Sequence, residues 1–171
     1  MTERILVAYA TRYGSTLEVA EKVGEILHDS GLKVEVRPAQ NVFSLEPYRA
    51  VVLGAPVFIG SLQKDIKRFL AKHQQALERM PVAFFALGPL DALAEMDGAV
   101  EQLDKELAKF PWLKLRTKQM FGGKYDPASL RFPDTFLTKL KFSPLYGRPV
   151  SDARDWEAIK TWALSLADAL Q

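Results

Sequence analysis

The hydrophobic positions fall into short unbroken runs separated by longer stretches with helical spacing. Unbroken apolar runs cover Ile5–Ala10, Ala50–Ala55 and Pro81–Leu87, which is typical of strands buried on both faces of a parallel sheet. Residues 32–36 alternate between apolar and polar side chains, which predicts a more exposed strand at an edge of the sheet. Residues 114–121 are expected to form the last strand.

Between these runs, apolar residues recur every three or four positions, as they do on the buried side of a helix. We expect helices over residues 15–30, 62–79, 93–110 and 153–170. The expected buried positions are Ile66, Phe69, Leu70 and Leu77 in the second helix, and Met96, Val100, Leu103, Leu107 and Phe110 in the third. Strands that alternate with helices predict a doubly wound α/β domain over residues 1–171, with helices on both faces of one parallel sheet.

The polar loop after the first strand carries the strongest candidate chemistry. It consists of Thr11, Arg12, Tyr13, Gly14, Ser15 and Thr16. Four of these six side chains carry hydroxyl groups, and Gly14 allows a tight turn that directs amides inward. Hydroxyls and the N-terminal amides of a helix make a phosphate site that needs little positive charge. The plainer alternative is that Ser15 or Thr16 only caps the helix.

Two nucleotide-binding sequence patterns are absent from this loop, which narrows the choice of ligand. The dinucleotide pattern G-x-G-x-x-G and the nucleotide pattern G-x-x-x-x-G-K-[ST] are both missing from it. Tyr9 and Ala10 stand where a response-regulator domain would have acidic residues. A mononucleotide phosphate is the best remaining ligand, and we expect it beyond the carboxyl ends of the strands, where open parallel sheets bind their ligands.

Two loops carry a resemblance to a known family. Residues 11–16 resemble the flavodoxin phosphate loop, T-x-T/Y-G-x-T, and residues 54–61 are similar to the stretch that flavodoxin-like proteins lay against the isoalloxazine ring. The resemblance implies a flavodoxin-like fold with a five-stranded parallel sheet of strand order 2-1-3-4-5. It also implies FMN as a non-covalent cofactor.

The resemblance assigns cofactor contacts to three loops. The implied residues are Thr11, Arg12, Tyr13, Gly14, Ser15, Thr16, Pro56, Val57, Phe58, Ile59, Gly60, Leu87, Gly88 and Pro89. A flat, mostly apolar ring needs an aromatic or apolar face and backbone donors at its edge, and Phe58 and Gly60 suit these roles. The alternatives are that residues 57–59 continue the core and that residues 87–89 form an ordinary turn. No side chain is assigned a catalytic role, because flavin N5 would carry the chemistry.

Residues 125–150 form an unusually long connection between the last strand and the last helix. We expect Phe136, Leu137 and Leu140 to lie on the apolar side of a short helix there. Five residues are candidates for contact with a substrate or partner: Arg131, Phe132, Phe136, Lys139 and Lys141. The partner could be a membrane surface, a quinone, an acidic tetrapyrrole or another subunit, and the alternative is a lid packed on its own core. With Asp155-Trp156, this insertion resembles the flavodoxin-like branch that contains quinone-dependent protoporphyrinogen oxidase.

Composition and charge exclude several other kinds of site and partner. Cysteine is absent and only two histidines are present, which excludes disulfides, cysteine nucleophiles and thiolate metal sites and leaves no metal site expected. The net charge of +2 is too small to indicate a nucleic-acid partner. The insertion is basic, and the sequence pI is about 8.8. Because electron-carrier flavodoxins are typically acidic, this charge favours an anionic porphyrin or lipid surface.

We therefore expect an FMN-dependent oxidoreductase that takes electrons from a small reduced donor and passes them to a quinone-like acceptor. Oxidation of protoporphyrinogen IX in haem synthesis is the specific activity that the resemblance implies. One alternative is an NAD(P)H-quinone reductase, because residues 54–60 also resemble the G-x-P-x-x-x-G run of that group. The others are a non-enzymatic electron carrier and a flavin-free scaffold or interaction module. No targeting or membrane-spanning segment is evident, so we expect a cytoplasmic protein. Peripheral contact at the inner membrane face and a homo-oligomer are left open.

Overall fold

The computed structural model describes residues 4–58, 60–88, 96–143 and 145–171. Its elements follow in the order β1 (Arg4–Tyr9), α1 (Ser15–Asp29), β2 (Lys33–Pro38), the 3-10 helix η1 (Ala39–Asn41), β3 (Tyr48–Phe58), β4 (Ser61–Leu62), α2 (Lys64–Lys72), α3 (Gln74–Leu77), β5 (Val82–Leu87), α4 (Met96–Leu107), β6 (Leu115–Phe121), β7 (Lys124–Tyr125), the 3-10 helix η2 (Pro127–Ser129), α5 (Asp134–Leu137), β8 (Ser151–Asp152) and α6 (Trp156–Ala169).

Five parallel strands form the sheet in the order β2-β1-β3-β5-β6. This order confirms the flavodoxin-like prediction, and β2 lies at an edge as its alternating pattern predicted. The structure adds β4, which turns back and pairs antiparallel with the end of β3, Phe58 opposite Ser61. Gly60 lies in this turn with a φ of 71°. The sequence pattern missed β4 because two residues are too few to show a period.

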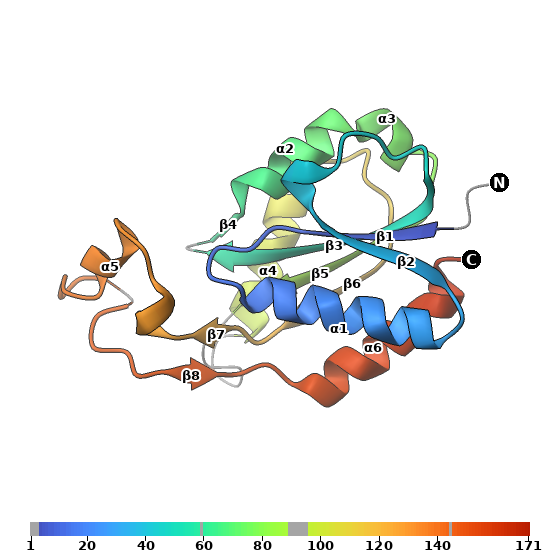
Figure 1. Ribbon diagram of the computed structural model, residues 1–171. Coiled ribbons are helices and arrows are strands. Elements are labelled where there is room, and N and C mark those ends of the chain that lie inside the picture. Colours follow the sequence, from blue (N-terminus) through green and yellow to red (C-terminus); the bar gives the residue numbers. More distant parts are fainter. Residues whose placement is uncertain (1–3, 59, 89–95, 144) are drawn as a thin grey trace.

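Alternate side chains of the buried strands pack on opposite faces of the sheet. In β1, Leu6 and Ala8 belong to the core with α2, α3 and α4, whereas Ile5 and Val7 belong to the core with α1 and α6. Figure 1 shows α1 and α6 on one side of the sheet and α2 and α3 on the other. Because both faces are covered, a strand such as β1 must be apolar at consecutive positions.

The helix expected over residues 62–79 is in fact two helices. α2 and α3 flank His73, whose φ of −108° and ψ of 17° interrupt the helical path. The His73 side chain is buried, with its ring 4.7 Å from the Phe69 ring and its Nε2 atom 3.3 Å from the Val42 carbonyl oxygen. This contact with the segment after η1 depends on tertiary packing, which helical spacing does not reveal.

The buried side of α4 follows the predicted stripe except at Val100, since Leu103 lies in the core and Met96, Leu107 and Phe110 are partly buried against it. Ala99 and Leu103 are buried, whereas Val100 is 38% exposed and the prediction for it was wrong. The reason is close packing, because a Cβ added at Gly88 would lie 3.3 Å from the Cβ of Ala99. Only a small side chain fits where α4 approaches the end of β5. Residues 93–95 of the predicted helix lie outside the described residues.

The last helix begins three residues later than predicted. Asp155 is the N-cap of α6, and its side chain accepts a hydrogen bond of 3.0 Å from the amide of Ala158. Ile159 and Leu166, which are seven residues apart on one side of α6, are fully buried. No helix among the described residues combines the length and apolarity that crossing a membrane requires.

The insertion forms a small unit beyond one end of the sheet. β7 and β8 pair antiparallel, with η2 and α5 between them. Figure 1 shows α5 far from the sheet, on the side toward which β3 runs. Tyr125, Leu130 and Leu145 are buried together, and Tyr13 and Leu137 pack against them. The insertion therefore has a core of its own, and its helix is a single turn.

Candidate functional site

The loop between β1 and α1 makes a compact turn. The Oγ1 atom of Thr11 accepts a hydrogen bond of 2.8 Å from the amide of Gly14, which leaves the hydroxyl proton of Thr11 available to a ligand. Gly14 has a φ of 92°, and a Cβ added there would meet nothing within 4 Å. Backbone conformation rather than crowding therefore requires glycine at this position.

α1 begins without a side-chain cap. Its N-cap residue is Gly14, and no described side chain closes the helix start. Ser15 and Thr16 are the first residues of the helix itself, so the alternative in which one of their hydroxyls caps α1 was wrong. The amides of the first turn have no acceptor within the helix, and the helix dipole makes this end attractive to an anion.

Thr16 has an unusual environment for a polar side chain. It is fully buried, and its Oγ1 atom has no hydrogen-bond partner among the described residues. An unsatisfied buried hydroxyl costs free energy that a ligand oxygen can recover. The orphaned hydroxyl, the uncapped helix start and the turn at Gly14 together fit a phosphate group.

Arg12 and Tyr13 join this loop to the insertion. The Nε and Nη2 atoms of Arg12 donate to the two carboxylate oxygens of Asp134, at 2.7 and 2.6 Å. Asp134 is buried at the start of α5, and the Arg12 guanidinium also lies 5.8 Å from the centre of the Tyr13 ring. Tyr13 packs against the insertion core. A direct contact of either residue with a cofactor stays a prediction.

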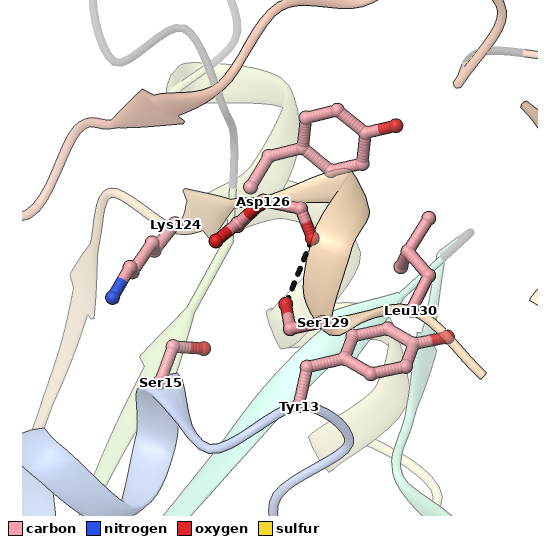
Figure 2. A pocket seen from close by; sticks show the side chains of 7 residues that line it. Tyr13, Ser15, Lys124, Asp126, Ser129 and Leu130 are labelled. Atoms are coloured by element: carbon pink, nitrogen blue, oxygen red, sulfur yellow. Dashed lines mark hydrogen bonds between the residues drawn. The ribbon is translucent and has the colours of Figure 1, made fainter. Parts of the chain in front are cut away.

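A small pocket lies between the loop and the insertion (Figure 2). It is lined by Tyr13, Ser15, Lys124, Tyr125, Asp126, Ser129 and Leu130. The hydroxyl of Ser129 donates to the backbone oxygen of Asp126 at 2.8 Å, the dashed line in Figure 2. The ammonium of Lys124 lies 3.5 Å from the Glu18 carboxylate. The pocket thus places a cation and hydroxyl groups beside the start of α1.

Arg154 holds the first turn of α1 from the segment after β8. Its Nη1 atom donates to a carboxylate oxygen of Glu18 at 2.7 Å and to the backbone oxygen of Ser15 at 3.4 Å. Its side chain is 3% exposed, and hydrogen bonds to Asp152 raise its pKa, so the guanidinium stays charged. Sequence reasoning missed Arg154, because an isolated arginine in a connecting segment gives no pattern.

The second predicted loop, residues 54–61, begins at the end of the sheet beside the third predicted loop, residues 87–89. Pro56 of β3 lies opposite Leu87 of β5 in the parallel register. Val57 is half-buried against the core, in keeping with the alternative that this stretch continues the core. Ring-contacting roles for Pro56, Val57 and Gly60 stay predictions.

The third predicted loop is described only at its start. Leu87 is buried, and the amide of Gly88 donates to the Phe121 carbonyl oxygen at 2.9 Å. A Cβ at Gly88 would lie 2.7 Å from the sulfur of Met120, so a larger residue here would require the Met120 side chain to shift. The predicted contacts of Ile59, Pro89 and the Phe58 side chain lie outside the described part of the chain.

A buried carboxylate of α4 holds the hairpin that follows β3. Glu106 accepts hydrogen bonds from the amide of Leu62 at 3.1 Å, from the ammonium of Lys67 at 2.9 Å, and from Lys109. Lys67 also donates to the hydroxyl of Ser61 at 2.8 Å. Burial alone would raise the pKa of Glu106, but these hydrogen bonds lower it to about 2. The ionised side chain therefore fixes β4 beside the end of β3.

Sequence reasoning also missed Glu106. The available signal was its position three residues after Leu103, on the same side of the helix. Glutamate at such a position is usually solvated, so the spacing alone did not indicate burial.

The predicted partner residues of the insertion are all exposed: Arg131, Phe132, Phe136, Lys139 and Lys141. None of them lines the pocket beside the loop. Direct contact with them therefore requires a partner that approaches the insertion from outside. In the described ranges, no three His, Cys, Asp or Glu side chains are grouped to hold a metal ion.

Comparison with known proteins identifies the family. The family model described as a flavodoxin domain matches residues 6–148, from β1 through most of the insertion. The chain belongs to the flavodoxin family. Flavodoxins bind FMN at the point where the strand order of the sheet reverses, between the first and third strands. In this flavodoxin-family chain the loop of residues 11–16 lies at that point.

A curated relative extends the similarity to nearly the whole chain. The protein named protoporphyrinogen IX dehydrogenase [quinone] of Escherichia coli (strain K12) is 26% identical over 176 residues. The alignment covers 96% of this chain and 94% of the relative. The two proteins are thus distantly related along their full lengths.

Solved flavodoxin structures share the fold. A flavodoxin from the domain Archaea has a TM-score of 0.60 at 13% identity, with 98% of each chain covered. A mutant flavodoxin of Pseudomonas aeruginosa has a TM-score of 0.61 at 15% identity, again with 98% of each chain covered. The rubredoxin oxygen:oxidoreductase of Desulfovibrio gigas contains a similar region, with a TM-score of 0.61 at 16% identity over 99% of this chain and 36% of that protein.

Proposed function

We propose that this flavodoxin-family chain binds FMN and oxidises protoporphyrinogen IX, with a quinone as the electron acceptor. The observation that carries the proposal is the fully buried, unpartnered hydroxyl of Thr16 at the uncapped start of α1. The choice of substrate is supported by the Escherichia coli relative, whose name states this activity and whose alignment includes most of the insertion.

We assign the phosphate of FMN to the loop of residues 11–16. The hydroxyls of Thr11 and Thr16 would donate to its oxygens, together with amides in the first turn of α1. Arg154 holds that turn, and Arg12 holds the loop against the insertion. Bound FMN supplies the redox chemistry, which is the acceptance of two electrons from a reduced donor and their release to an acceptor.

We propose that the insertion attracts the substrate. In the overall reaction, six hydrogen atoms leave each protoporphyrinogen molecule in three two-electron steps, and three quinone molecules are reduced to quinols. Protoporphyrinogen carries carboxylates, and a basic segment raises the local concentration of an anionic substrate. Arg131, Lys139 and Lys141 are the exposed cations that supply this attraction, which weakens as salt screens it. We propose a cytoplasmic location with access to quinone at the inner face of the membrane.

An anaerobic turnover assay tests this function. The chain is purified, loaded with FMN, and mixed with protoporphyrinogen IX and a quinone, and porphyrin fluorescence and quinol are followed together. Porphyrin formation that requires both the quinone and the FMN-loaded protein is the expected result. A reaction without protein corrects for spontaneous oxidation of the porphyrinogen.

The same assay separates the alternatives. Rapid quinone reduction by NAD(P)H without porphyrin formation would indicate an NAD(P)H-quinone reductase. Stable FMN binding with no turnover of any small donor would indicate an electron carrier. Protein that stays colourless and cannot be loaded with FMN would contradict the cofactor assignment itself.

A further inference from the structure

Glu18 places a negative charge in the first turn of α1, beside the loop that we assign to phosphate. Its amide donates to the carbonyl oxygen of Gly14, so it lies one turn after that glycine. Burial alone would raise the pKa of Glu18, but hydrogen bonds from Arg154 and Lys124 lower it, and the carboxylate is ionised at neutral pH. An uncompensated carboxylate at this position would repel an anion bound at the start of the helix.

Two cations neutralise this carboxylate. The Nη1 atom of Arg154 donates to one carboxylate oxygen of Glu18 at 2.7 Å, and the ammonium of Lys124 lies 3.5 Å from the other. Lys124 belongs to β7, and Arg154 follows β8. Figure 2 shows Lys124 lining the same pocket as Ser15, the first residue of α1. The charge at the start of α1 is thus set by residues that are distant in the sequence.

Arg154 is enclosed by its partners. Its Nε and Nη2 atoms donate to the two carboxylate oxygens of Asp152 at 2.9 and 2.7 Å, and its Nη1 atom also donates to the carbonyl oxygen of Ser15 at 3.4 Å. The centre of the Trp156 ring lies 4.8 Å from the guanidinium carbon, and the Arg154 side chain is buried. Arg154 therefore acts on the loop through Glu18 and Ser15 and is not itself a ligand.

The charges of this group of side chains balance. Arg154 and Lys124 are the cations, and Glu18 and Asp152 are the carboxylates. We call these four residues the charge cluster. Hydrogen bonds from Arg154 lower the pKa of Asp152, so both carboxylates are ionised. Removal of either cation would leave a net negative charge next to the candidate phosphate site.

We infer that Arg154 and Lys124 are positioning residues that make the site select FMN over riboflavin. By cancelling the charge of Glu18, they allow the hydroxyls and amides of residues 11–16 to bind a phosphate without a repelling carboxylate. The phosphate of FMN carries about two negative charges at neutral pH, whereas riboflavin carries none. The inference rests on the proposed cofactor and adds which residues decide that its phosphorylated form is bound.

A purely structural role for the charge cluster predicts a different result. If Arg154 only tied the segment after β8 to α1, its loss would loosen the site and weaken FMN and riboflavin alike. A charge-balancing role affects only a ligand that carries the phosphate. Two probes separate these roles: riboflavin has the ring without the phosphate, and inorganic phosphate has the charge without the ring.

Titration of the FMN-free full chain at low salt tests the inference. Flavin fluorescence measures the affinities for FMN and riboflavin, and competition with FMN measures that for inorganic phosphate. Lys124→Gln should weaken FMN and phosphate binding roughly fivefold, and Glu18→Gln should strengthen both by a similar factor. Neither variant should change the affinity for riboflavin. The two side chains are 36% and 47% exposed, so both variants should fold.

A double variant tests Arg154. Arg154→Gln should weaken FMN and phosphate binding by about tenfold, because a buried charge is screened less than an exposed one. Adding Glu18→Gln should restore most of this loss, since the remaining charges of Lys124 and Asp152 again balance. A purely structural role gives no such rescue. Circular dichroism and the thermal midpoint check that each variant is folded.

The matched control is an exposed ion pair farther along α1. Lys22→Gln and Glu25→Gln each remove one charge of this pair and should change none of the three affinities. The differences among the charge-cluster variants should shrink as sodium chloride is raised, because salt screens the charges.

The possible failures are distinguishable. Equal losses of FMN and riboflavin affinity in Lys124→Gln and Arg154→Gln, or an FMN affinity that neither Lys124→Gln nor Glu18→Gln changes, would overturn the inference and leave the cofactor assignment intact. A wild-type chain that binds neither FMN nor inorganic phosphate would overturn the cofactor assignment, and this inference with it.

Discussion

The guanidinium of Arg12 forms a bidentate ion pair with the carboxylate of Asp134, although 122 residues separate them in the chain. Arg12 belongs to the loop that we assign to the FMN phosphate, and Asp134 begins α5 in the insertion. Two parallel hydrogen bonds fix orientation as well as distance. The pair therefore connects the candidate cofactor loop directly to the insertion.

Removal of the Arg12 guanidinium should destabilise the protein. Arg12→Gln leaves the Asp134 carboxylate buried without its cation, and we expect a loss of about 1–3 kcal/mol in the free energy of unfolding. Urea denaturation measures this loss. Trypsin should also cleave the insertion faster, since its connection to the loop is broken.

The matched control for Arg12 is an exposed ion pair. Lys22→Gln breaks the pair with Glu25 on the surface of α1, and we expect less than about 0.5 kcal/mol. If Arg12→Gln changed stability no more than this control, the pair would not be holding the insertion.

Replacing Thr16 should separate cofactor binding from stability. Thr16→Val keeps the shape of the side chain and removes a hydroxyl that has no partner among the described residues. The free energy of unfolding of the FMN-free protein should stay the same or rise by about 1 kcal/mol. FMN affinity should fall, by roughly fivefold to thirtyfold, because one phosphate hydrogen bond is lost.

Thermal unfolding with and without FMN, together with fluorescence titration, measures both effects of Thr16→Val. The exposed Thr161→Val serves as the control and should change neither quantity. Unchanged FMN affinity in the Thr16 variant would remove the main support for the phosphate assignment.

The substitution of Gly14 should affect FMN binding through the backbone. Gly14 and Gly31 have φ angles of 92° and 85°, and a Cβ at either would meet nothing within 4 Å. Gly14→Ala and Gly31→Ala should therefore each cost about 1–2 kcal/mol of unfolding free energy for the same conformational reason. Only Gly14→Ala should weaken FMN binding. A similar loss of affinity in both variants would point to stability rather than to the loop.

The Glu106 carboxylate should give the protein a specific acid sensitivity. Its pKa in the folded protein is about 2, against a usual value of 4.5, so the folded state binds fewer protons. Its contribution to stability is therefore complete above pH 4.5 and is lost as the pH falls toward 2. Glu106→Gln should lower the free energy of unfolding by about 1–2 kcal/mol at neutral pH, allowing for solvent screening of the lysines.

This difference between Glu106→Gln and the wild type should disappear as the pH approaches 2. Chemical denaturation across that range measures it. Glu157→Gln, which removes an exposed carboxylate in the first turn of α6, should follow the wild-type curve. A gap between Glu106→Gln and wild type that is constant with pH would show that packing, not ionisation, is lost.

The positions of strands and helices could be predicted from the sequence because they depend on the period of apolar residues, whereas the strand order was implied by the resemblance to flavodoxins. The apolar run of β1 predicted burial on both faces, and the alternation in β2 predicted an edge. The same reasoning failed at Val100 and at His73. Each of these positions is decided by a contact with another element. Near Val100, Ala99 of α4 packs closely against Gly88. At His73, the imidazole contacts the carbonyl oxygen of Val42.

The sequence by itself determined that a hydroxyl-rich loop follows a buried strand and opens a helix, because local order and spacing specify both. Only the tertiary structure decided that Thr16 is buried without a partner, that Arg12 pairs with Asp134, and that Glu106 holds β4. These facts depend on which distant segments pack together. Burial removes water as a competing partner, so the fold decides whether each polar group has a partner and which one.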